Sequence, residues 1–525
     1  MRASNQSRDR KGAAKTYRLR GAAGKKGKKM AASGSTKTKG LCKGVQVASP
    51  YLPGARATKP RVPAEDFKGK RIHFMGAGGI GVSAMMQLCS ARGAVVSGCD
   101  CSLNGQAAAL QARGIRVEHG HDSAHVADCD ELVYTAAVEP SHPEITRALA
   151  EGKIASTRMH MLGRIMRGLR TICVTGSHGK TTTTWLIANL LITAGRDPSV
   201  LVGGVVKAMS GNVRIGRGAE FVAEVDESDN RLAEVVPSIP VLTNIDNDHL
   251  DHYHTVDAIE EAVTRFLAST DTTDSQAVLI GCGDDIRVRR SLQNASLKCR
   301  RAALAYGFAQ HCDVIGMNLR REGLGWRFDA LTPSGLLENI ELPMPGEHNV
   351  LNALAAVSVA WHLNIPEICL RTALSKCERV GRRFEIKGTK NGVRVVDDYG
   401  HHPTEIAATL KAARGSTQGK LGVIFQPHRY TRTQQLLPQF ATCFSAADCV
   451  WVMPIYAASE EPIPGVDHHA LVAAIEKLSD AKAVAVSSRD EAIELAATWA
   501  REGDTLITQG AGDVTRAGDE LVARL

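Results

Sequence analysis

A short run of glycines followed by Lys and Thr stands between a predicted strand at residues 171–174 and a predicted helix. The run consists of Gly176, Ser177, His178, Gly179, Lys180, Thr181 and Thr182. Glycines let backbone amides approach a triphosphate, a lysine reaches the β- and γ-phosphates, and a threonine hydroxyl binds the accompanying Mg²⁺. Val174 breaks the strict G-x4-G-K-[ST] pattern, but a shortened GxxGKT loop keeps the chemical groups at the required offsets. We therefore predict that this loop binds ATP.

Acidic residues follow further along the chain, directly after predicted strands. EVDESDN begins with Glu224 after the strand at 220–223, and TNIDNDHLDHY contains His249 after the apolar run 239–242. Ligands of an open α/β sheet bind at the carboxyl ends of its strands, and a carboxylate there beside a phosphate loop usually holds Mg²⁺. We expect Glu224 to bind Mg²⁺ together with Thr181, and His249 to serve as a further ligand or to orient one.

A second glycine-rich turn lies nearer the N-terminus, in HFMGAGGIGVSAMMQL. Its glycines, in a GxGxxG pattern after the predicted strand 71–75, are Gly76, Gly78, Gly79 and Gly81. Such a turn binds a nucleotide phosphate at a helix N-terminus, and Asp100, at the end of the next predicted strand, stands where a ribose-binding acid usually lies. Taken by itself, this motif would suggest an NAD-dependent oxidoreductase. Hydride transfer needs no second phosphate loop, so the two glycine-rich motifs together favour an ATP-consuming ligase with a nucleotide-bearing substrate.

The elements that position these residues alternate strand with helix, which is typical of parallel α/β sheets. The pattern begins at 71–75, restarts at 171–174 and restarts again near 393–396 and 421–425. We therefore predict an α/β fold of three domains behind a disordered basic tail. The predicted boundaries are 1–67 for the tail and 68–165, 166–378 and 379–525 for the domains.

The composition excludes several other classes of protein. The formal net charge of +9 is concentrated in residues 1–43, which carry fourteen Lys and Arg and one acid, so the remaining chain is mildly acidic. We expect no requirement for nucleic acid. Membrane insertion and secretion are not expected, because no long apolar stretch is present. The 13 cysteines form no CxxC pair, which is typical of reduced thiols in a cytoplasmic protein.

Taken together, the motifs resemble the Mur ligases over residues 71–525. The matching segments are HFMGAGGIG, VTGSHGKTTTT, EVDESD, TNIDNDHLDHY, PGEHNVLNALAA, GRRFEIKG, DDYGHHPTEI, FQPHRYTRT and GAGDVT. Three of these segments are most similar to the branch that joins L-alanine to UDP-N-acetylmuramate, namely HFMGAGGIG, DDYGHHPTE and FQPHRYTRT. The resemblance implies a Rossmann-like UDP-binding domain, a central P-loop ATPase domain and a C-terminal Rossmann-like amino-acid-binding domain. It also implies ligation through an acyl phosphate in peptidoglycan precursor synthesis, with ATP and Mg²⁺.

The resemblance assigns further residues to the site. It implies that Lys180, His249, His402 and Arg429 act in catalysis. On the nucleotide side it adds His348, Asn349, Asn352 and Arg383 to the phosphate loop. Asn349 could instead cap the helix that begins there. For the amino acid it implies His401, His402, Arg429 and Arg432, and a planar guanidinium suits the alanine carboxylate because it can bond both oxygens.

Several residues depart from the family pattern, and the sequence leaves some alternatives open. The departures, all on the UDP-sugar side, are TAAV at 135–138, His142, His160 and Asn230, Arg231 and Leu232. The alternatives are a recycling ligase that attaches a tripeptide to UDP-N-acetylmuramate and a non-catalytic nucleotide-binding protein. Selectivity among alanine, glycine and serine, and the choice between monomer and dimer, also stay open.

Overall fold

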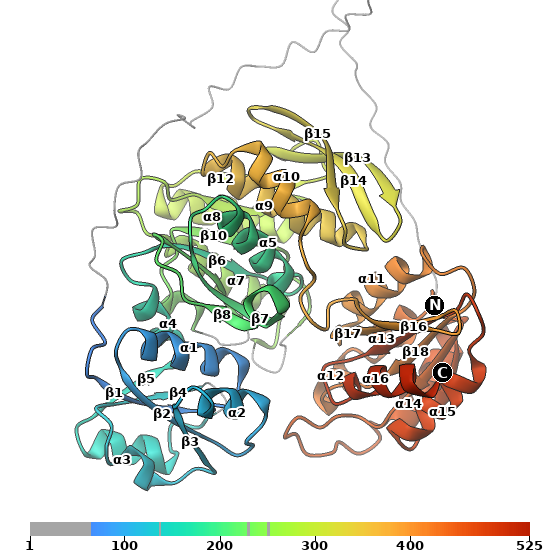
Figure 1. The fold of residues 1–525 in the computed structure, drawn as a ribbon, viewed down its shortest axis with the longest axis horizontal. Coiled ribbons are helices and arrows are strands. Elements are labelled where there is room, and N and C mark those ends of the chain that lie inside the picture. The colour runs from blue at the N-terminus through green and yellow to red at the C-terminus, as the bar shows by residue number, and fades with distance from the viewer. Residues whose placement is uncertain (1–64, 136–137, 228–230, 249–252) are drawn as a thin grey trace, which may run out of the picture. The chain divides into compact units, whose positions relative to one another are not determined.

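The computed structural model describes residues 65–135, 138–227, 231–248 and 253–525 (Figure 1). Three separate sheets, each flanked by helices, follow one another along the chain, so the predicted α/β class is confirmed. Most of the predicted tail lies outside the described residues. At the end of that tail, however, Phe67 is fully buried and Nε of Arg164 donates to Glu65 at 2.9 Å, so packing begins before residue 68, where the first domain was predicted to start.

The first sheet has five parallel strands in the order β3-β2-β1-β4-β5. Its elements are β1 (Arg71–Met75), α1 (Ile80–Ala91), β2 (Val95–Asp100), α2 (Gly105–Gln111), β3 (Arg116–His119), η1 (Ser123–Val126), β4 (Glu131–Tyr134), α3 (Pro143–Ala150), β5 (Ile154–Thr157) and α4 (Arg158–Met166). Because side chains alternate along a strand, Ile72 and Phe74 pack in the large core with α1 and α4. Met75 packs on the other face, in a small core with η1 and α3.

The second sheet has ten strands in the order β15-β14-β13-β12-β11-β10-β6-β9-β7-β8. Its strands are β6 (Arg170–Thr175), β7 (Ser199–Val206), β8 (Gly211–Arg214), β9 (Glu220–Glu224), β10 (Ile239–Leu242), β11 (Leu279–Cys282), β12 (Ala303–Gly307), β13 (Val314–Glu322), β14 (Gly325–Thr332) and β15 (Gly335–Leu342). The strands around β6 are parallel, whereas β13, β14 and β15 form an antiparallel meander, which is absent from the elements predicted from the sequence.

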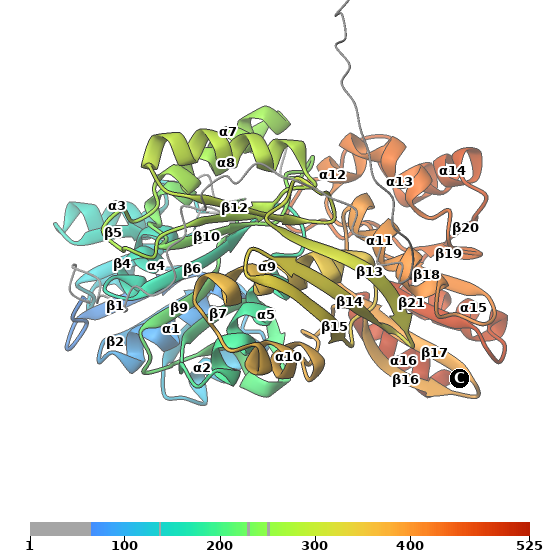
Figure 2. The same ribbon diagram turned by 90° about the horizontal axis from the view of Figure 1, so that it is seen from above.

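Helices cover both faces of this second sheet. They are α5 (Lys180–Thr193), η2 (Lys207–Met209), η3 (Leu232–Glu234), α7 (Val256–Ala268), α8 (Ile286–Cys299), α9 (Glu347–His362) and α10 (Glu367–Ser375). Helices α7 and α8 lie side by side on one face, and α5, α9 and α10 lie on the other (Figure 2). Residues 170–175 of β6 are all buried between these layers, so the phosphate loop that follows leaves from the centre of a rigid sheet.

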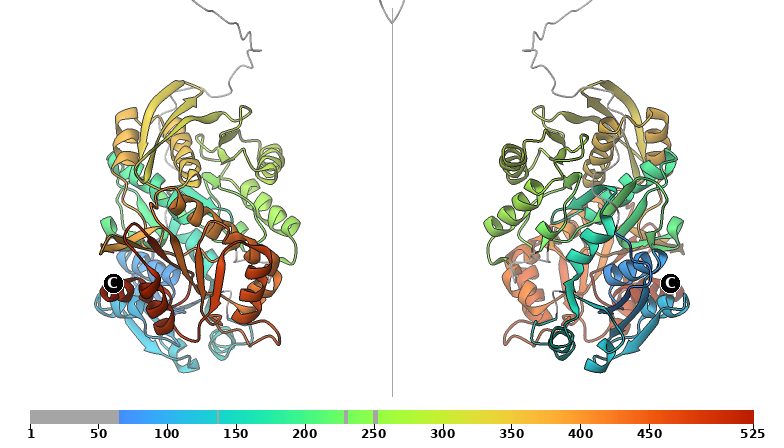
Figure 3. Two further views of the ribbon diagram at one scale, coloured as in Figure 1. Left: turned by 90° about the vertical axis from the view of Figure 1, so that its right-hand side faces the viewer. Right: turned by 90° about the vertical axis from the view of Figure 1, so that its left-hand side faces the viewer.

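The third sheet has six strands in the order β16-β17-β21-β18-β19-β20, of which only the edge strand β16 is antiparallel to its neighbour. Its elements are β16 (Glu385–Lys390), β17 (Val393–Asp398), α11 (Pro403–Arg414), β18 (Leu421–Phe425), α12 (Tyr430–Gln435), α13 (Leu437–Cys443), β19 (Cys449–Val452), α14 (His468–Leu478), β20 (Lys482–Ala485), α15 (Arg489–Trp499), β21 (Thr505–Gln509) and α16 (Thr515–Arg524). Alternating residues fill two cores, one with α11, α13 and α14 and the other with α15 and α16. Helices stand on both faces of this sheet (Figure 3, left).

Three of the motifs identified in the sequence follow the carboxyl ends of parallel strands. β6 ends at Thr175 before the phosphate loop, β9 ends at Glu224, and β17 ends at Asp398 before the HHP segment. This is the edge at which open α/β sheets bind ligands. Among the described residues, no helix combines the length and the apolar character needed to cross a bilayer.

Gly98 in β2 provides a test of the packing between the first sheet and α1. A Cβ atom added there would lie 2.8 Å from Cε of Met86 and 2.8 Å from the carbonyl oxygen of Phe74. We expect Gly98→Ala to lower the free energy of unfolding by about 1–3 kcal/mol, measured by urea denaturation. Gly105→Ala is the control, because a Cβ there meets nothing within 4 Å. Equal effects of the two substitutions would contradict the packing argument.

Candidate active site

Two glycines give the phosphate loop its shape. Gly176 and Gly179 have φ angles of +124° and +80°, which favour glycine. A Cβ atom at Gly176 would lie 2.3 Å from Oγ1 of Thr243, and one at Gly179 would lie 2.6 Å from Oδ1 of Asn352. Helix α5 begins at Lys180, so the loop turns directly into a helix N-terminus. A helix start with exposed amides is a ready-made site for phosphate groups.

Lys180 is held beside a buried carboxylate. Its Nζ lies 2.8 and 2.9 Å from the two carboxylate oxygens of Glu227 and 3.7 Å from Asp226. Burial disfavours the ammonium charge, but the attraction of Glu227 and Asp226 outweighs it and raises the pKa of Lys180 above its ordinary value. The lysine therefore carries its positive charge into the site. Glu227 is an addition to the predicted site residues, since the sequence showed it only as one member of an acidic run.

Thr181 and Glu224 supply adjacent oxygen atoms. Oγ1 of Thr181 donates to Glu224 at 3.1 Å, and the other carboxylate oxygen accepts from the amide of Gly203 at 2.6 Å. Burial raises the pKa of Glu224, against the pull of Lys180. Hydroxyl and carboxylate oxygens are the donors that Mg²⁺ prefers, so this pair fits that ion. His249, the other predicted metal ligand, lies outside the described residues.

His178 occupies a buried position between two carboxylates. Its Nε2 lies 2.8 Å from Asp246, and its Nδ1 lies 3.4 Å from Glu405 in α11. Burial opposes a charge on the imidazole, but the hydrogen bond to Asp246 and the attraction of Glu405 prevail and raise the pKa of His178 to about 10. His178 is therefore an imidazolium that joins the phosphate loop to the third sheet, a role that the sequence did not reveal.

A cavity of about 430 Å³ opens beside the phosphate loop. The predicted nucleotide-binding residues that line it are His178, Gly179, Thr182, His348, Asn349, Asn352 and Arg383, and residues beyond the prediction include Asn244, Tyr306 and Phe384. Asn349 does not cap helix α9, because the N-cap position is Gly346 and the side-chain Nδ2 of Asn349 donates to the carbonyl of Pro345 at 2.6 Å. The cavity therefore brings most of the predicted nucleotide-binding residues together.

A second cavity, of about 950 Å³, lies on the other side of the loop. Predicted residues that line it are Gly81, Ser177, Lys180, Thr181, Glu224, His401, Arg429 and Arg432, and residues beyond the prediction include Thr135, Arg158 and Lys207. Gly179, Arg383 and Glu405 line both cavities. A ligand in the larger cavity would thus meet the phosphate end of a nucleotide in the smaller one.

The two histidines of the HHP segment have different surroundings. His401 lines the larger cavity, its Nδ1 donates to the carbonyl of Tyr399 at 3.2 Å, and burial followed by repulsion from Arg432 lowers its pKa to about 3. His402 caps helix α11 by accepting from the Thr404 amide, and its Nε2 donates to the carbonyl of Asn247 at 3.1 Å. Both ring nitrogens of His402 are therefore used within the protein.

Arg429 and Arg432 project from the start of α12 into the larger cavity. Arg429 has a φ angle of +71°, and one of its guanidinium nitrogens lies 4.0 Å from Glu460. Arg432 donates to Asp248 at 3.0 Å, and only 11% of its side chain is exposed. Two guanidinium groups at one wall make this region suitable for a carboxylate.

The backbone amides of the first glycine turn donate mainly to the end of β2. The amide of Gly76 donates to Cys99, that of Gly79 donates to Gly76, and that of Gly78 donates to the carboxylate of Asp100 at 2.8 Å. The other oxygen of Asp100 accepts from the amide of Ser102 at 2.8 Å. None of Gly76, Gly78, Gly79 and Asp100 lines either described cavity. Gly81, Ile80 and Arg158 do, so the structure favours these as the contacts for a ligand there.

Comparisons with known proteins agree on one family. Three family models match in succession: "Mur ligase family, catalytic domain" at residues 71–170, "Mur ligase middle domain" at 174–360 and "Mur ligase, glutamate ligase domain" at 382–512. The UDP-N-acetylmuramate–L-alanine ligase of Desulfatibacillum aliphaticivorans is 39% identical over 86% of this chain and 98% of its own. That of Solibacter usitatus is 40% identical over 87% of this chain and 96% of its own.

Solved structures show the same similarity. A UDP-N-acetylmuramate–alanine ligase from Thermotoga maritima has a TM-score of 0.73 at 26% identity and covers 86% of this chain and 98% of its own. A murein peptide ligase from Psychrobacter arcticus has a TM-score of 0.63 at 24% identity, covering 87% and 98%.

The charge on His178 can be tested with Asp246→Asn. We expect the pKa of His178 to fall from about 10. Burial lowers this pKa, and without Asp246 fewer negative charges remain to oppose that effect. Imidazole signals of histidine-labelled protein in NMR would measure it. Because the pKa of His178 in the folded chain exceeds the ordinary value of 6.5, the charged imidazole stabilises the folded state. This stabilisation is fully present below about pH 6.5 and is lost as the pH rises through about 10.

The matched control for this measurement is Asp257→Asn, which removes an acid whose side chain is 83% exposed. This change should leave the titration of His178 as it is in the unsubstituted chain. A His178 pKa that stays near its original value in Asp246→Asn would show that this carboxylate does not hold the imidazole charged.

Proposed function

The chain belongs to the Mur ligase family, and we infer that it joins L-alanine to UDP-N-acetylmuramate at the expense of ATP, in peptidoglycan precursor synthesis. One observation of the site supports this function most directly. The phosphate loop, with Lys180, Thr181 and Glu224, stands between a cavity of nucleotide size and a larger one that is walled by arginines. An ATP-dependent ligase needs such an arrangement, because the nucleotide must activate a second bound substrate.

ATP is required because a carboxylate is a poor electrophile. In the proposed reaction, an oxygen of the muramate carboxylate attacks the γ-phosphorus, the bond to ADP breaks, and an acyl phosphate forms. Lys180 and Arg383 are placed to neutralise the negative charge of the transferring group. Thr181 and Glu224 would hold Mg²⁺, which when bound offsets further charge on the phosphates. Burial of Lys180 against Glu227 keeps its ammonium in position before the nucleotide arrives.

The amino acid must then reach the activated carbonyl. We assign its carboxylate to Arg429 and Arg432, and its nitrogen to the vicinity of His401. Since Nδ1 of His401 donates to Tyr399 and the ring is neutral, Nε2 can accept a hydrogen bond from the amine. The amine nitrogen attacks the carbonyl carbon, the bond between that carbon and the phosphate oxygen breaks, and the phosphate leaves with the proton that the amine gives up. His402 acts as a positioning residue, because its ring holds the start of α11 against residue 247.

The domain roles follow from the same arrangement. We propose that residues 68–165 bind the UDP portion through Ile80, Gly81 and Arg158, that 166–378 bind ATP, and that 379–525 bind the amino acid. A cytoplasmic location is part of the proposal, since ATP and a UDP-linked sugar are the reactants.

The function can be tested by ADP release from purified protein with ATP, Mg²⁺ and UDP-N-acetylmuramate. L-alanine, glycine, L-serine and the recycling tripeptide would be offered separately. We expect release that depends on L-alanine and falls at least about a hundredfold in Lys180→Ala, because a charge that stabilises the transition state is lost. Release with the tripeptide alone would instead indicate the recycling ligase. No release with any acceptor, while ATP still binds, would indicate a non-catalytic nucleotide-binding protein.

The role of Arg432 can be tested by Arg432→Lys, which keeps the charge but removes the planar pair of donors. We expect the KM for L-alanine to rise about tenfold or more, while the KM for ATP changes little. Steady-state kinetics would measure both constants. Arg501→Lys in the same part of the chain, where the arginine donates to the carbonyl of Thr498 on the surface, is the control. Equal increases in both constants would argue against a specific contact with alanine.

A further inference from the structure

The two faces of the first sheet have different interiors. The face toward α1 and α4 belongs to the large apolar core, whereas the face toward η1 and α3 has only a small cluster of buried apolar residues. Beside this small cluster, His73 and Glu144 are both fully buried. Burying an imidazole or a carboxylate is unfavourable unless a partner compensates for the lost water. This face of the sheet therefore contains polar groups that the proposed reaction does not use.

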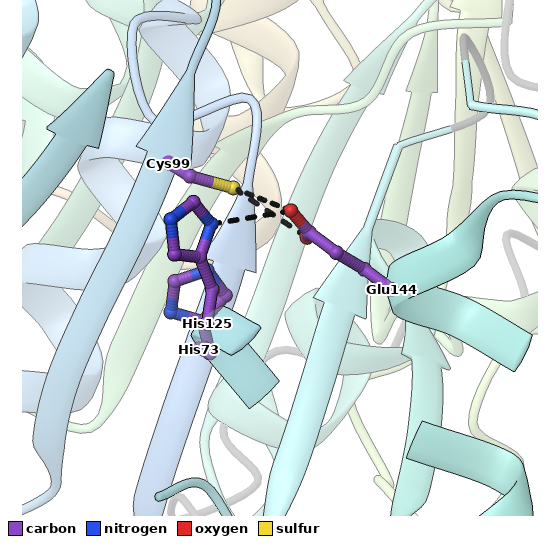
Figure 4. Close-up of side chains that lie close together, drawn as sticks. All are labelled: His73, Cys99, His125 and Glu144. Atoms are coloured by element: carbon purple, nitrogen blue, oxygen red, sulfur yellow. Dashed lines mark hydrogen bonds and ion pairs between the residues drawn. The ribbon is translucent and has the colours of Figure 1, made fainter. Parts of the chain in front are cut away.

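Four side chains from four elements converge there (Figure 4). They are His73 of β1, Cys99 of β2, His125 of η1 and Glu144 of α3, and one potential ligand atom of each lies within 4.8 Å of all the others. Cys99 Sγ lies 3.5 Å from Oε2 of Glu144, and Nδ1 of His125 lies 3.2 Å from Oε1. His121, at the partly exposed side, has its Nδ1 3.2 Å from Cys99 Sγ and 3.6 Å from Glu144.

Each of the two inner imidazoles is oriented by the nitrogen that points away from the cluster. Nδ1 of His73 lies 2.8 Å from Oγ of Ser97, and Nε2 of His125 lies 2.7 Å from Oε2 of Glu118. Metal-binding histidines are usually held in this way, by a hydroxyl, carbonyl or carboxylate at the second nitrogen. Among the described residues, Nε2 of His73 has no hydrogen-bond partner although it is buried. That nitrogen is the one left to bind a ligand in the cluster.

We propose that His73, Cys99, His125 and Glu144 form a structural zinc site. Imidazole, thiolate and carboxylate are all donors that zinc accepts, and four of them complete its usual tetrahedral coordination. Mg²⁺ and Ca²⁺ prefer oxygen donors and suit this set poorly. When zinc binds, the Cys99 thiol proton passes to solvent and the metal takes its place. The bound ion joins β1 and β2 to η1 and α3, and so takes the place of apolar packing on this face.

Cobalt substitution distinguishes this site from the other group of potential metal ligands among the described residues. The full chain, purified without chelator, should contain about one zinc per molecule. After removal of zinc, Co²⁺ should produce the strong near-ultraviolet absorption of a cobalt–thiolate bond. The other described group of potential metal ligands, His178, Asp246 and His402, contains no cysteine and cannot give this band. Metal analysis and absorption spectra measure both properties without reference to ligase activity.

Two substitutions and a matched control complete the test. Cys99→Ser should abolish the band, whereas Cys101→Ser, at an exposed cysteine two positions away, should retain it. Ser97→Ala leaves all four donors in place and should weaken zinc binding about 10- to 100-fold through loss of the His73 orientation. It keeps the test valid even if Cys99→Ser does not fold. A wild-type chain that neither retains zinc nor develops the band, or a band that persists in Cys99→Ser, would overturn the proposal.

Discussion

A buried imidazolium connects the parts of the active site. His178 belongs to the phosphate loop, whereas its partners Asp246 and Glu405 come from the segment after β10 and from the first turn of α11. A charge removed from water is tolerated only when it is paired, so the three segments must keep this arrangement together. Asp246 also accepts from the hydroxyl of Thr404 at 2.7 Å, which strengthens the same junction. The shape of both cavities depends on this contact, because Glu405 lines each of them.

Local patterns in the sequence predicted the frame of the site well. The strands expected at 71–75, 239–242 and 421–425 begin and end where the structure has them, and the phosphate loop follows β6 as predicted. These predictions depend on short-range properties, namely apolar runs, glycines and helix formers. The antiparallel meander of β13, β14 and β15 was missed, because it adds strands to an existing sheet without any site motif to mark it.

The partners within the site could not be predicted in the same way. Glu227 pairs with Lys180 across 47 positions, and Glu405 meets His178 across more than two hundred, so only the folded chain brings them together. Asp100 shows the opposite case: its position at the end of β2 was predicted, but its carboxylate accepts from the amides of Gly78 and Ser102. The cluster around His73 has no motif spacing at all, since its members come from four separate elements. A local pattern can locate a loop, but it cannot show which distant side chain will form an ion pair or hydrogen bond with that loop.

The wall that separates the two cavities has a thermodynamic consequence. Gly179, Arg383 and Glu405 face both of them, so a ligand on one side changes the surroundings of a ligand on the other. If a nucleotide in the smaller cavity changes the affinity of the larger cavity for its ligand by some factor, that ligand changes the affinity for the nucleotide by the same factor. This holds because both orders of binding lead to the same doubly occupied state. Where that factor differs from one, the affinity of each cavity for its ligand is defined only together with the occupancy of the neighbouring cavity.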